Sequence, residues 1–546
     1  MRSLLRALCI LALSSVTYAA APCRFAPSFD VDSVFSDPAT QSEFIATVMM
    51  RENAFLQPTP CPLPPVAGQD LTNIGFHAKT GMTLDGHRWT VEEGLPLGEP
   101  HLFTAASKES LHLAMIALAL QPGESALPAQ LFFSPSNPAN ASAVVLDMLS
   151  TKVNTLDSFF EDFPGFGGFM PWVFVSDQGL TPTTDFNSSV PSLDNGQMFW
   201  GAYAVAQTLS REYPNVLHRP MQRASTSNDV LYLSPSTTLA QRWTNVYQRM
   251  IANALIVFYD SRTNSTLGQF RTVSKIADRT LPIDPNMSPY DASANYLSAA
   301  GETYLNDPYE GELFTNMAFL FSDWSWTGAS SDSVWVYKRA MLQAVEFQVH
   351  DPSDPSAPPT TINVERGYWY SGHEKWKYFL CPYMSSEWSR RVFAAGEKAR
   401  TWNSVQQGLA GGFASCAGMA ETDAQDTGYK SDCGVQSLAF EPVSNTDILS
   451  PYAFAALMLA SPSHGLAWYH NLLLAPRAQT CFGSLEALNR TGANIAPLST
   501  WGEETQGHAC TAHSKLASLK SSLTLSSLSS LRVAALLLQT PKSPRC

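Results

Sequence analysis

Charged residues are scarce in this chain, and basic residues are the scarcer kind. Only 15% of its 546 residues are charged, against about a quarter in an average soluble protein. With 34 Lys and Arg against 47 Asp and Glu, the net charge of −13 excludes a protein that follows a phosphate backbone, so no nucleic-acid partner is expected. No apolar run approaches the ~18 residues of a membrane span, while 45% hydrophobic residues suffice for a large folded core.

The chain also lacks the short motifs of several enzyme classes. There is no Cys-x-x-Cys pair and no His-Glu-x-x-His, so nothing supports a structural zinc site or a zinc hydrolase. Gly-x-Ser-x-Gly is absent, which makes a nucleophilic serine hydrolase a poor interpretation. No sequence repeat of about 20–50 residues is visible. We therefore expect neither a metal nor any other cofactor.

The first residues predict export. Arg2 and Arg6 accompany an apolar run at residues 7–13, a pattern typical of a secretory signal peptide. We expect cleavage near residues 19–21, which removes residues 1–20 and makes the mature protein secreted and extracellular. Glycan acceptor motifs, which favour surface loops in a secreted chain, begin at Asn140, Asn187, Asn264, Asn286 and Asn489.

The cysteine count agrees with an oxidising compartment. Nine cysteines minus Cys9 of the signal leave an even number of eight, which favours disulfides, although the pairing cannot be read from sequence. These eight are Cys23, Cys61, Cys381, Cys416, Cys433, Cys481, Cys510 and Cys546.

Composition divides the rest of the chain into three parts. Residues 21–70 are rich in Pro and short of periodicity, which predicts an extended N-terminal wrap. Residues 71–501 contain no strong linker and form one predicted domain. Residues 502–546 are a Ser- and Leu-rich tail without aromatic residues, which could be one amphipathic helix, a disordered segment or the product of altered splicing.

Helical periodicity is the strongest structural signal in the predicted domain. Apolar residues at three- and four-residue spacing predict helices, which are separated by long loops rich in Gly, Pro, Ser, Asn and Trp. This pattern predicts an all-α fold, a helical toroid with its site at one mouth. The predicted helices span residues 111–120, 143–156, 197–211, 239–259, 310–321, 334–349, 386–399 and 452–460.

The densest chemical signal is the segment at residues 365–384, ERGYWYSGHEKWKYFLCPYM. It gathers aromatic side chains around His373, Glu374 and Trp376. Flat rings stack on the apolar faces of sugars, and His and carboxylate groups bind hydroxyls, so the combination predicts a carbohydrate subsite. The alternative interpretation is a buried aromatic core.

Acidic residues at loop-to-helix junctions are the second signal. Glu310 follows Asp-Pro at a predicted helix start, and Asp194 precedes the apolar helix that contains Trp200. Residues 421–432 and 445–452 carry further acidic residues. A glycosidase needs one carboxyl group to protonate the leaving oxygen and another to activate water. The alternative is that acidic residues at helix starts serve stability alone.

Several of these segments together resemble a known family. DNG before a helix, YEGE opening another, GYWYSGHEKW, GYKSDCG and DILSPYAFAALML are similar to segments of the glycoamylase-like superfamily, in particular the fungal endo-β-1,2-glucanases of glycoside hydrolase family 162, relatives of family 144. The resemblance covers roughly residues 70–501. It implies a metal-free (α/α)6 toroid that cuts linear β-1,2-glucan internally with inversion of configuration. The expected partner is a glucan polysaccharide or oligosaccharide, bound by a monomer without a membrane span.

The resemblance also implies roles for individual residues. The segment containing Glu310 matches the family's general acid, with Glu312 as the fallback. The family's base is an Asp near the C-terminus, close to a Trp. It acts on water through a relay that includes a hydroxyl of the substrate. Here Trp501 is followed by two glutamates and no Asp, which leaves Asp447 as the internal candidate. The expected substrate-binding residues are Asp194, Trp200, His373, Glu374, Trp376 and Tyr452.

Two rival functions remain open at this point. The first is a catalytically impaired relative that binds glucan but lacks the C-terminal base. The second is an exo-acting glucosidase or phosphorylase on the same toroid, which the length of the products would distinguish.

Overall fold

The fold comes from a computed structural model of the chain. The predicted signal peptide (residues 1–20), Trp501 and the tail from residue 502 lie outside the residues that it describes. Within the described residues, no helix is long and apolar enough to cross a membrane. The described residues are 24–56, 75–90, 96–98, 100–217, 237–261, 268–298, 304–305, 311–341, 343–350, 356–409, 421–422, 425–426, 432–444, 447–480 and 482–500.

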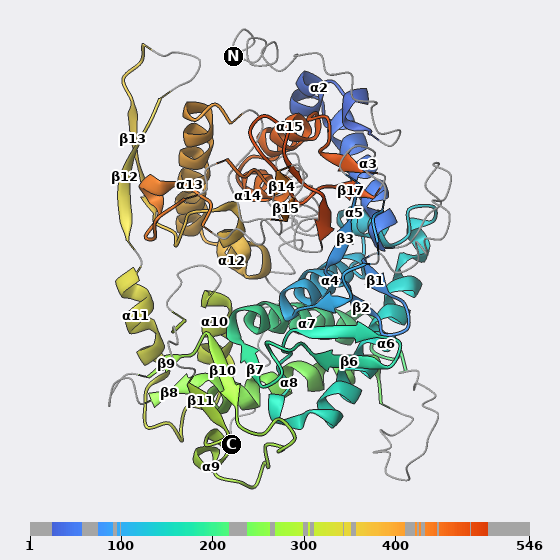
Figure 1. Ribbon diagram of the computed structural model, residues 1–546, viewed down its shortest axis with the longest axis vertical. Helices are drawn as coiled ribbons and strands as arrows, with labels where there is room; N and C mark the ends of the chain where they lie inside the picture. Colours follow the sequence, from blue (N-terminus) through green and yellow to red (C-terminus); the bar gives the residue numbers. More distant parts are fainter. Residues whose placement is uncertain are drawn as a thin grey trace.

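Helices form most of the described molecule (Figure 1), as the periodicity predicts. Helix α8 shows the physical reason, since the Thr238 side chain accepts a hydrogen bond from the backbone N of Gln241 at the helix start. One face of the helix then buries Trp243, Val246 and Met250. The α-helices are α2 (Val31–Ser36), α3 (Pro38–Leu56), α4 (Ala106–Ala119), α5 (Leu127–Phe133), α6 (Ala141–Asp162), α7 (Ser192–Glu212), α8 (Leu239–Phe258), α9 (Pro289–Ser293), α10 (Gly311–Phe321), α11 (Val334–Met341), α12 (Trp376–Leu380), α13 (Glu387–Gln406), α14 (Ala455–Ala460) and α15 (Pro462–Leu473).

The loops between these helices pair as short antiparallel strands, so the all-α prediction describes the main layers but not the loops. The sheets have two or three strands each, for example β4-β5-β6 and β11-β10-β7. The strands are β1 (Phe76–His77), β2 (Met82–Thr83), β3 (Gly86–Arg88), β4 (Phe103–Thr104), β5 (Val173–Ser176), β6 (Gly179–Pro182), β7 (Ser189–Pro191), β8 (Tyr259–Asp260), β9 (Gln269–Phe270), β10 (Val273–Ile276), β11 (Tyr296–Ser298), β12 (Ala344–Val349), β13 (Thr360–Glu365), β14 (Glu421–Thr422), β15 (Gln425–Asp426), β16 (Gln479–Thr480), β17 (Gly483–Ser484), β18 (Ala487–Leu488), β19 (Ile495–Ala496) and β20 (Leu498–Thr500).

The N-terminal segment is a correction to the sequence analysis, because it is helical over α2 and α3 rather than extended. Pro38 is the first residue of α3, where its missing N–H costs nothing. Phe44 and Val48 lie one turn apart, beside Ile45 and Met49, and all four are buried. This helical spacing outweighs the proline content around it. In Figure 1, α2 and α3 lie beside α15, so the two ends of the described chain pack together.

The helix predicted for residues 334–349 is also wrong in its second half. Helix α11 ends at Met341, and β12 follows and pairs with β13 in an antiparallel hairpin. Val345, Phe347 and Val349 alternate with exposed residues, which is the period of a strand and not of a helix. In Figure 1 this hairpin extends along one side of the molecule, next to α13.

The core between α7, α8 and α10 is built from aromatic rings. Phe314 of α10 meets Phe258 at 4.9 Å and Phe270 at 5.1 Å between ring centroids, both edge to face. Phe199 and Tyr203 of α7 continue this packing. The high aromatic content of the sequence is therefore used largely inside the fold.

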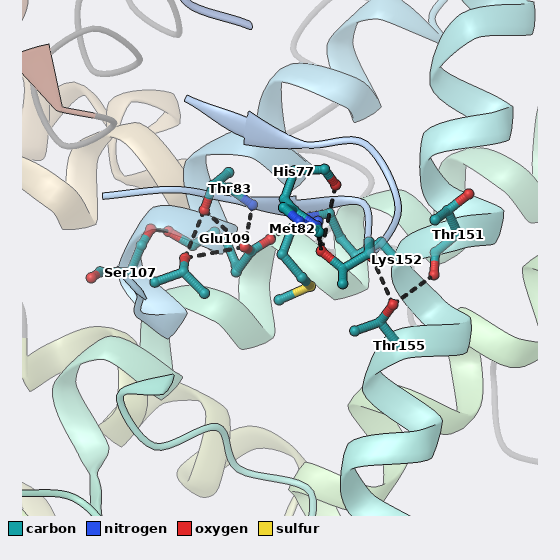
Figure 2. Close-up of polar contacts among 11 residues, drawn as sticks. His77, Met82, Thr83, Ser107, Glu109, Thr151, Lys152 and Thr155 are labelled. Atoms are coloured by element: carbon teal, nitrogen blue, oxygen red, sulfur yellow. Dashed lines mark hydrogen bonds and ion pairs between the residues drawn. The ribbon is translucent and has the colours of Figure 1, made fainter. Parts of the chain in front are cut away.

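A buried ion pair joins the first described hairpin to two helices (Figure 2). Glu109 of α4 accepts hydrogen bonds from the backbone N and the side-chain Oγ1 of Thr83, each at 2.8 Å, and from Thr104 Oγ1 at 3.2 Å. Its other oxygen accepts from Lys152 of α6, and both charged side chains have no exposed surface. Burial lowers the pKa of Lys152. This network fixes β2 and β4 on α4 and α6.

Cysteines and glycan acceptor sites are described only in part. Cys381 is a buried free thiol and Cys433 is buried, while the other six cysteines downstream of the predicted signal peptide lie outside the described residues. The predicted disulfides therefore remain a prediction. Asn140, Asn187 and Asn286 are exposed. Asn489 is half-buried and Asn264 lies outside the described residues, so glycosylation also remains a prediction.

Candidate active site

Helix α7 lies between α4 and α10 at close range. A Cβ atom on Gly196 would lie 2.5 Å from the backbone N of Phe314, and one on Gly201 would lie 2.8 Å from the carbonyl O of Ser110. Only glycine permits such an approach of backbones. The first turn of α7 therefore holds in place the first turn of α10, which carries Glu312.

Glu312 is the centre of a buried polar cluster. Its side chain lies at the start of α10 and the residue is only 4% exposed. Lys377 Nζ of α12 lies 3.2 Å from Oε1, and the hydroxyl of Tyr383, in a 3-10 turn at Pro382–Ser385, donates to Oε2 at 2.5 Å. Asn316 Nδ2 donates to the same hydroxyl at 3.0 Å. Both carboxylate oxygens thus accept a hydrogen bond from a fixed donor.

The charges of this cluster act on the groups around it. Burial, and then the charge of Glu312, raises the pKa of Tyr383 well above its ordinary value, so the phenol keeps its proton and remains a donor. Burial and the same charge raise the pKa of the Cys381 thiol. Glu365 lies 3.8 Å from Lys377, so one ammonium group faces two carboxylates.

The aromatic segment from Glu365 onward forms a loop that closes on itself. Glu374 accepts hydrogen bonds from the backbone N of Tyr368 at 3.0 Å and of Trp369 at 2.5 Å. Between them and Glu374, Tyr370 adopts φ 58°, a left-handed conformation that is uncommon for a residue with a side chain. Lys375 Nζ lies 4.3 Å from the centre of the Tyr370 ring. Glu374 therefore fixes the shape of the loop, and this role does not depend on whether Glu374 also binds a substrate.

A second charged cluster lies at the first turn of α4. Lys108 Nζ is 2.5 Å from Asp85 Oδ1, and the His101 ring is 2.8 Å from Asp85 Oδ2. Burial opposes the charge on Asp85, but the Lys108 charge and the hydrogen bonds from His101 and Lys108 prevail and lower its pKa to about 2. Asp85 is therefore an anion throughout the neutral range.

The charges of three carboxylates from distant parts of the chain act on Lys108. Burial opposes its charge, yet Asp85, Glu486 and Asp194 together raise its pKa. Glu486 precedes β18, is 4% exposed, and accepts a hydrogen bond from Thr500 Oγ1 at 2.7 Å. Within the described residues, no three His, Cys, Asp or Glu side chains are arranged as ligands of one metal ion.

The predicted substrate-binding residues are placed as follows. Asp194 lies in the first turn of α7 and accepts from Trp172 Nε1 at 2.8 Å. Trp200 is 3% exposed and donates from Nε1 to the carbonyl O of Leu313 at 2.9 Å. Trp200, Trp376 and Tyr452 are buried, which favours a core role for their rings, and sugar stacking stays a prediction. The remaining positions are Trp376 (2% exposed), Tyr452 (2% exposed, in a 3-10 turn at Pro451–Phe454) and His373 (in a 3-10 turn at Gly372–Lys375).

The structure describes only one of the two predicted catalytic residues. Glu310 lies outside the described residues, immediately before the first residue of α10. Asp447 is described, and its side chain is 49% exposed. Its Oδ1 accepts from the backbone N of Arg490 at 2.8 Å and from the Arg490 Nε at 2.9 Å. Asp447 therefore ties two surface loops together, and its catalytic role stays a prediction.

Sequence reasoning missed Asp85, Lys108 and Glu486. Lys108 lies near the start of a predicted helix, so its place in the secondary structure can be read from the sequence. Nothing in the sequence links it to Glu486, because the two are brought together only by the pairing of β3 with β20 and the packing of α4. Hydrogen bonds from Trp89 to Ser499 and Pro497 reinforce this pairing.

Several solved structures are similar to this chain. The endo-β-1,2-glucanase of Talaromyces funiculosus in complex with sophorose is 30% identical, with a TM-score of 0.73 over 92% of this chain and 90% of that one. A variant of the same enzyme with a Glu replaced by Gln, in complex with β-1,2-glucan, is 29% identical, with a TM-score of 0.73 over 96% and 94% of the two chains. A putative glucoamylase of Bacteroides uniformis, 11% identical, shares the fold alone, with a TM-score of 0.52 over 92% and 94%.

The family follows from the sequence match. Residues 82–522 match the endo-β-1,2-glucanase family SGL, glycoside hydrolase family 162, and the chain belongs to that family. The match extends past Trp501 into the Ser- and Leu-rich tail. No curated protein matches the chain.

Proposed function

We propose that this chain is a secreted endo-acting hydrolase that cleaves linear β-1,2-glucan with inversion of configuration, on an (α/α)6 toroid. The observation that supports this most directly is 30% identity over 92% of the chain to a glucanase whose complex with sophorose has been solved. The carboxylates whose charges act on Lys108 add the type of residue that glycoside hydrolysis requires.

Glu310 is the proposed general acid. In the sequence it directly precedes α10, whose first turn packs closely against α7. The fallback Glu312 is a poorer candidate, because both of its oxygens already accept hydrogen bonds from Lys377 and Tyr383. A general acid has to direct its proton to the glycosidic oxygen. Glu312 instead serves to hold the start of the helix.

The general base is proposed among the carboxylates of the C-terminal part. Asp447 is half exposed and committed to Arg490. Glu486 is buried and belongs to the group of carboxylates around Lys108. In an inverting reaction this base takes a proton from water, directly or through a substrate hydroxyl, while the acid protonates the departing oxygen. We favour Glu486 over Asp447.

The activity is tested by incubating the purified full chain with linear β-1,2-, β-1,3-, β-1,4- and β-1,6-glucans and sizing the products. We expect cleavage of the β-1,2-linked chain alone, with oligosaccharides of intermediate length at early times. Single glucose units from the start would indicate an exo-acting enzyme instead. Proton NMR of the first products should show the α-anomer at the new reducing end, since inversion of a β-linkage produces it.

The residues are tested in matched pairs. Glu310→Gln should lower kcat at least about a hundredfold, and Glu312→Gln should lower it less while reducing stability. Glu486→Gln should lower kcat by a similar factor to Glu310→Gln, whereas Asp447→Asn should leave it within about threefold. Full activity of Glu486→Gln with loss in Asp447→Asn would reverse the proposal for the base. Glucan binding without hydrolysis by the unmodified chain would favour the impaired relative.

Secretion is a separate part of the proposal. It is supported by the signal pattern at residues 1–20 and by the exposure of three of the glycan acceptor asparagines. N-terminal sequencing of the protein recovered from the medium of a eukaryotic expression host should find a start near residues 20–22. Retention of the full-length chain inside the cells would refute it.

A further inference from the structure

One small sheet turns aromatic side chains toward solvent. In β5 and the residue before it, Val173 and Val175 are buried, while Trp172 and Phe174 are 38% and 45% exposed. Successive residues of a strand face opposite sides, so the two aromatic residues share the outer face. Phe103 of β4 lies directly opposite Phe174 in the register and shares that face. Such a face normally carries polar residues.

The aromatic groups on this face are contiguous. His101 stacks on Phe103 with centroids 5.3 Å apart and an interplanar angle of 25°, and its side chain is 59% exposed. Trp172 meets Phe103 edge to face at 5.4 Å. We call the set of His101, Phe103, Trp172 and Phe174 the outer aromatic face. Contiguous exposed apolar surface on a folded protein commonly marks a binding site.

Polar groups border the outer aromatic face at its inner end. Trp172 Nε1 donates to Asp194, and the His101 ring bonds to Asp85. Both carboxylates belong to the cluster around Lys108. Rings flanked by carboxylates match the two surfaces of a sugar, an apolar face and a rim of hydroxyls.

This face is connected to the proposed cleavage site through α7. Asp194 lies in the first turn of α7, two residues before Gly196, whose position touches the backbone of Phe314 in the first turn of α10. A polysaccharide that enters the proposed site extends beyond it in both directions.

We propose that the outer aromatic face is a distal glucan-binding subsite, at which Phe174 stacks on a glucose unit away from the cleaved bond, beside Trp172, whose ring itself stacks on Phe186 with centroids 4.5 Å apart. The assignment rests on the proposed function for the identity of the sugar. Its role is to hold long chains, so it contributes to the affinity for polymer more than to the affinity for short oligosaccharides.

The test compares Phe174→Ala with Trp388→Ala in the full chain. Trp388 is 74% exposed on α13, in a different part of the molecule (Figure 1), and controls for the loss of an exposed ring. Phe174→Ala should raise the KM for long β-1,2-glucan about three- to tenfold relative to the KM for a short β-1,2-linked oligosaccharide, as expected for the loss of one stacking contact. Trp388→Ala should leave this ratio unchanged.

Failure of the inference and failure of the proposed function give different results. If the unmodified chain hydrolyses β-1,2-glucan and Phe174→Ala shows the same KM ratio, the inference alone is overturned. If the unmodified chain hydrolyses no glucan, calorimetric titration with β-1,2-glucan decides. Binding that Phe174→Ala weakens supports the subsite, and no binding overturns both proposals. A shift of Phe174→Ala from dimer to monomer in sedimentation, with unchanged glucan affinity, would identify the face as a contact between copies and overturn the subsite.

Discussion

Replacing either partner of the buried ion pair between Glu109 and Lys152 should lower the free energy of unfolding, but by unequal amounts. Both side chains have no exposed surface. Replacing Glu109 by Leu leaves the Lys152 ammonium in the interior without its counter-charge, which costs about 3–5 kcal/mol of unfolding free energy. It also removes the acceptor of the Thr83 N–H, and a buried donor without a partner costs a further ~1–3 kcal/mol. We expect Glu109→Leu to cost at least about 4 kcal/mol.

Replacing Lys152 by Met is expected to cost less. Met has a similar length and leaves no cavity of consequence, and Glu109 keeps its hydrogen bonds from Thr83 and Thr104. Glu109 loses its counter-charge, but the hydrogen bonds that it keeps still stabilise the carboxylate, so we expect a cost at the low end for a broken buried ion pair, about 3 kcal/mol. The double variant no longer contains a buried unpaired charge and should be more stable than Glu109→Leu alone by at least ~1 kcal/mol.

Urea denaturation followed by tryptophan fluorescence measures all three variants against the unmodified chain. Glu387→Gln is the control, because it breaks an ion pair with Arg391 in which both side chains are more than two-thirds exposed. That change should alter the unfolding free energy by less than about 0.5 kcal/mol. Equal costs for the two single replacements, or a double variant less stable than Glu109→Leu, would refute the reasoning.

Three further predictions concern the candidate site. Gly196→Ala should cost about 1–3 kcal/mol and lower kcat, measured by thermal unfolding and initial rates, because its Cβ would collide with the backbone of Phe314. Glu374→Gln keeps one acceptor oxygen for the aromatic loop and should cost about 1–2 kcal/mol in urea unfolding, and Glu374→Ala should cost more. Burial lowers the pKa of Lys375 to about 8, so between that pH and its ordinary 10.5 the unfolded chain binds a proton that the folded chain lacks. The unfolding free energy should therefore rise with pH in this window, relative to Lys375→Met, by up to about 1.4 kcal/mol per pH unit.

The sequence predicts a helix well where the helix has one continuous apolar face. Helix α8 begins at the predicted residue and ends one residue early, because an N-cap and a continuous apolar stripe mark it. Helix α3 was missed because the proline content around it hid a short apolar stripe. The sequence predicts a helix at the position of β12. The partner strand β13 lies beyond a Pro-rich stretch, and cross-strand pairing leaves no local signal in β12 itself.

The candidate site was predictable in residue types but not in contacts. The sequence identified Glu312 and the aromatic segment, yet the hydrogen bond from Tyr383 to Glu312 joins residues 71 positions apart. Whether a side chain is buried was harder to predict than which residue types form the site. Trp200 and Trp376 are predicted to bind sugar because rings stack on sugars, and the structure buries both. The exposed Phe174 lies in a strand that the sequence does not predict, and the exposed Trp172 directly precedes that strand.

The charge balance of the two clusters bears on which of them takes part in bond cleavage. At Glu312, the ammonium group of Lys377 faces two carboxylates, Glu312 and Glu365, and the Tyr383 hydroxyl also donates to Glu312. At Lys108, the charges of three carboxylates, Asp85, Asp194 and Glu486, act on a single ammonium group. The excess of negative charge is therefore larger in this second cluster. Glycosidic bond cleavage passes through a positively charged, oxocarbenium-like transition state, which such an excess stabilises. The same excess is what a base needs to accept a proton from water, and it favours the cluster that contains Glu486 over the exposed pair of Asp447 and its arginine.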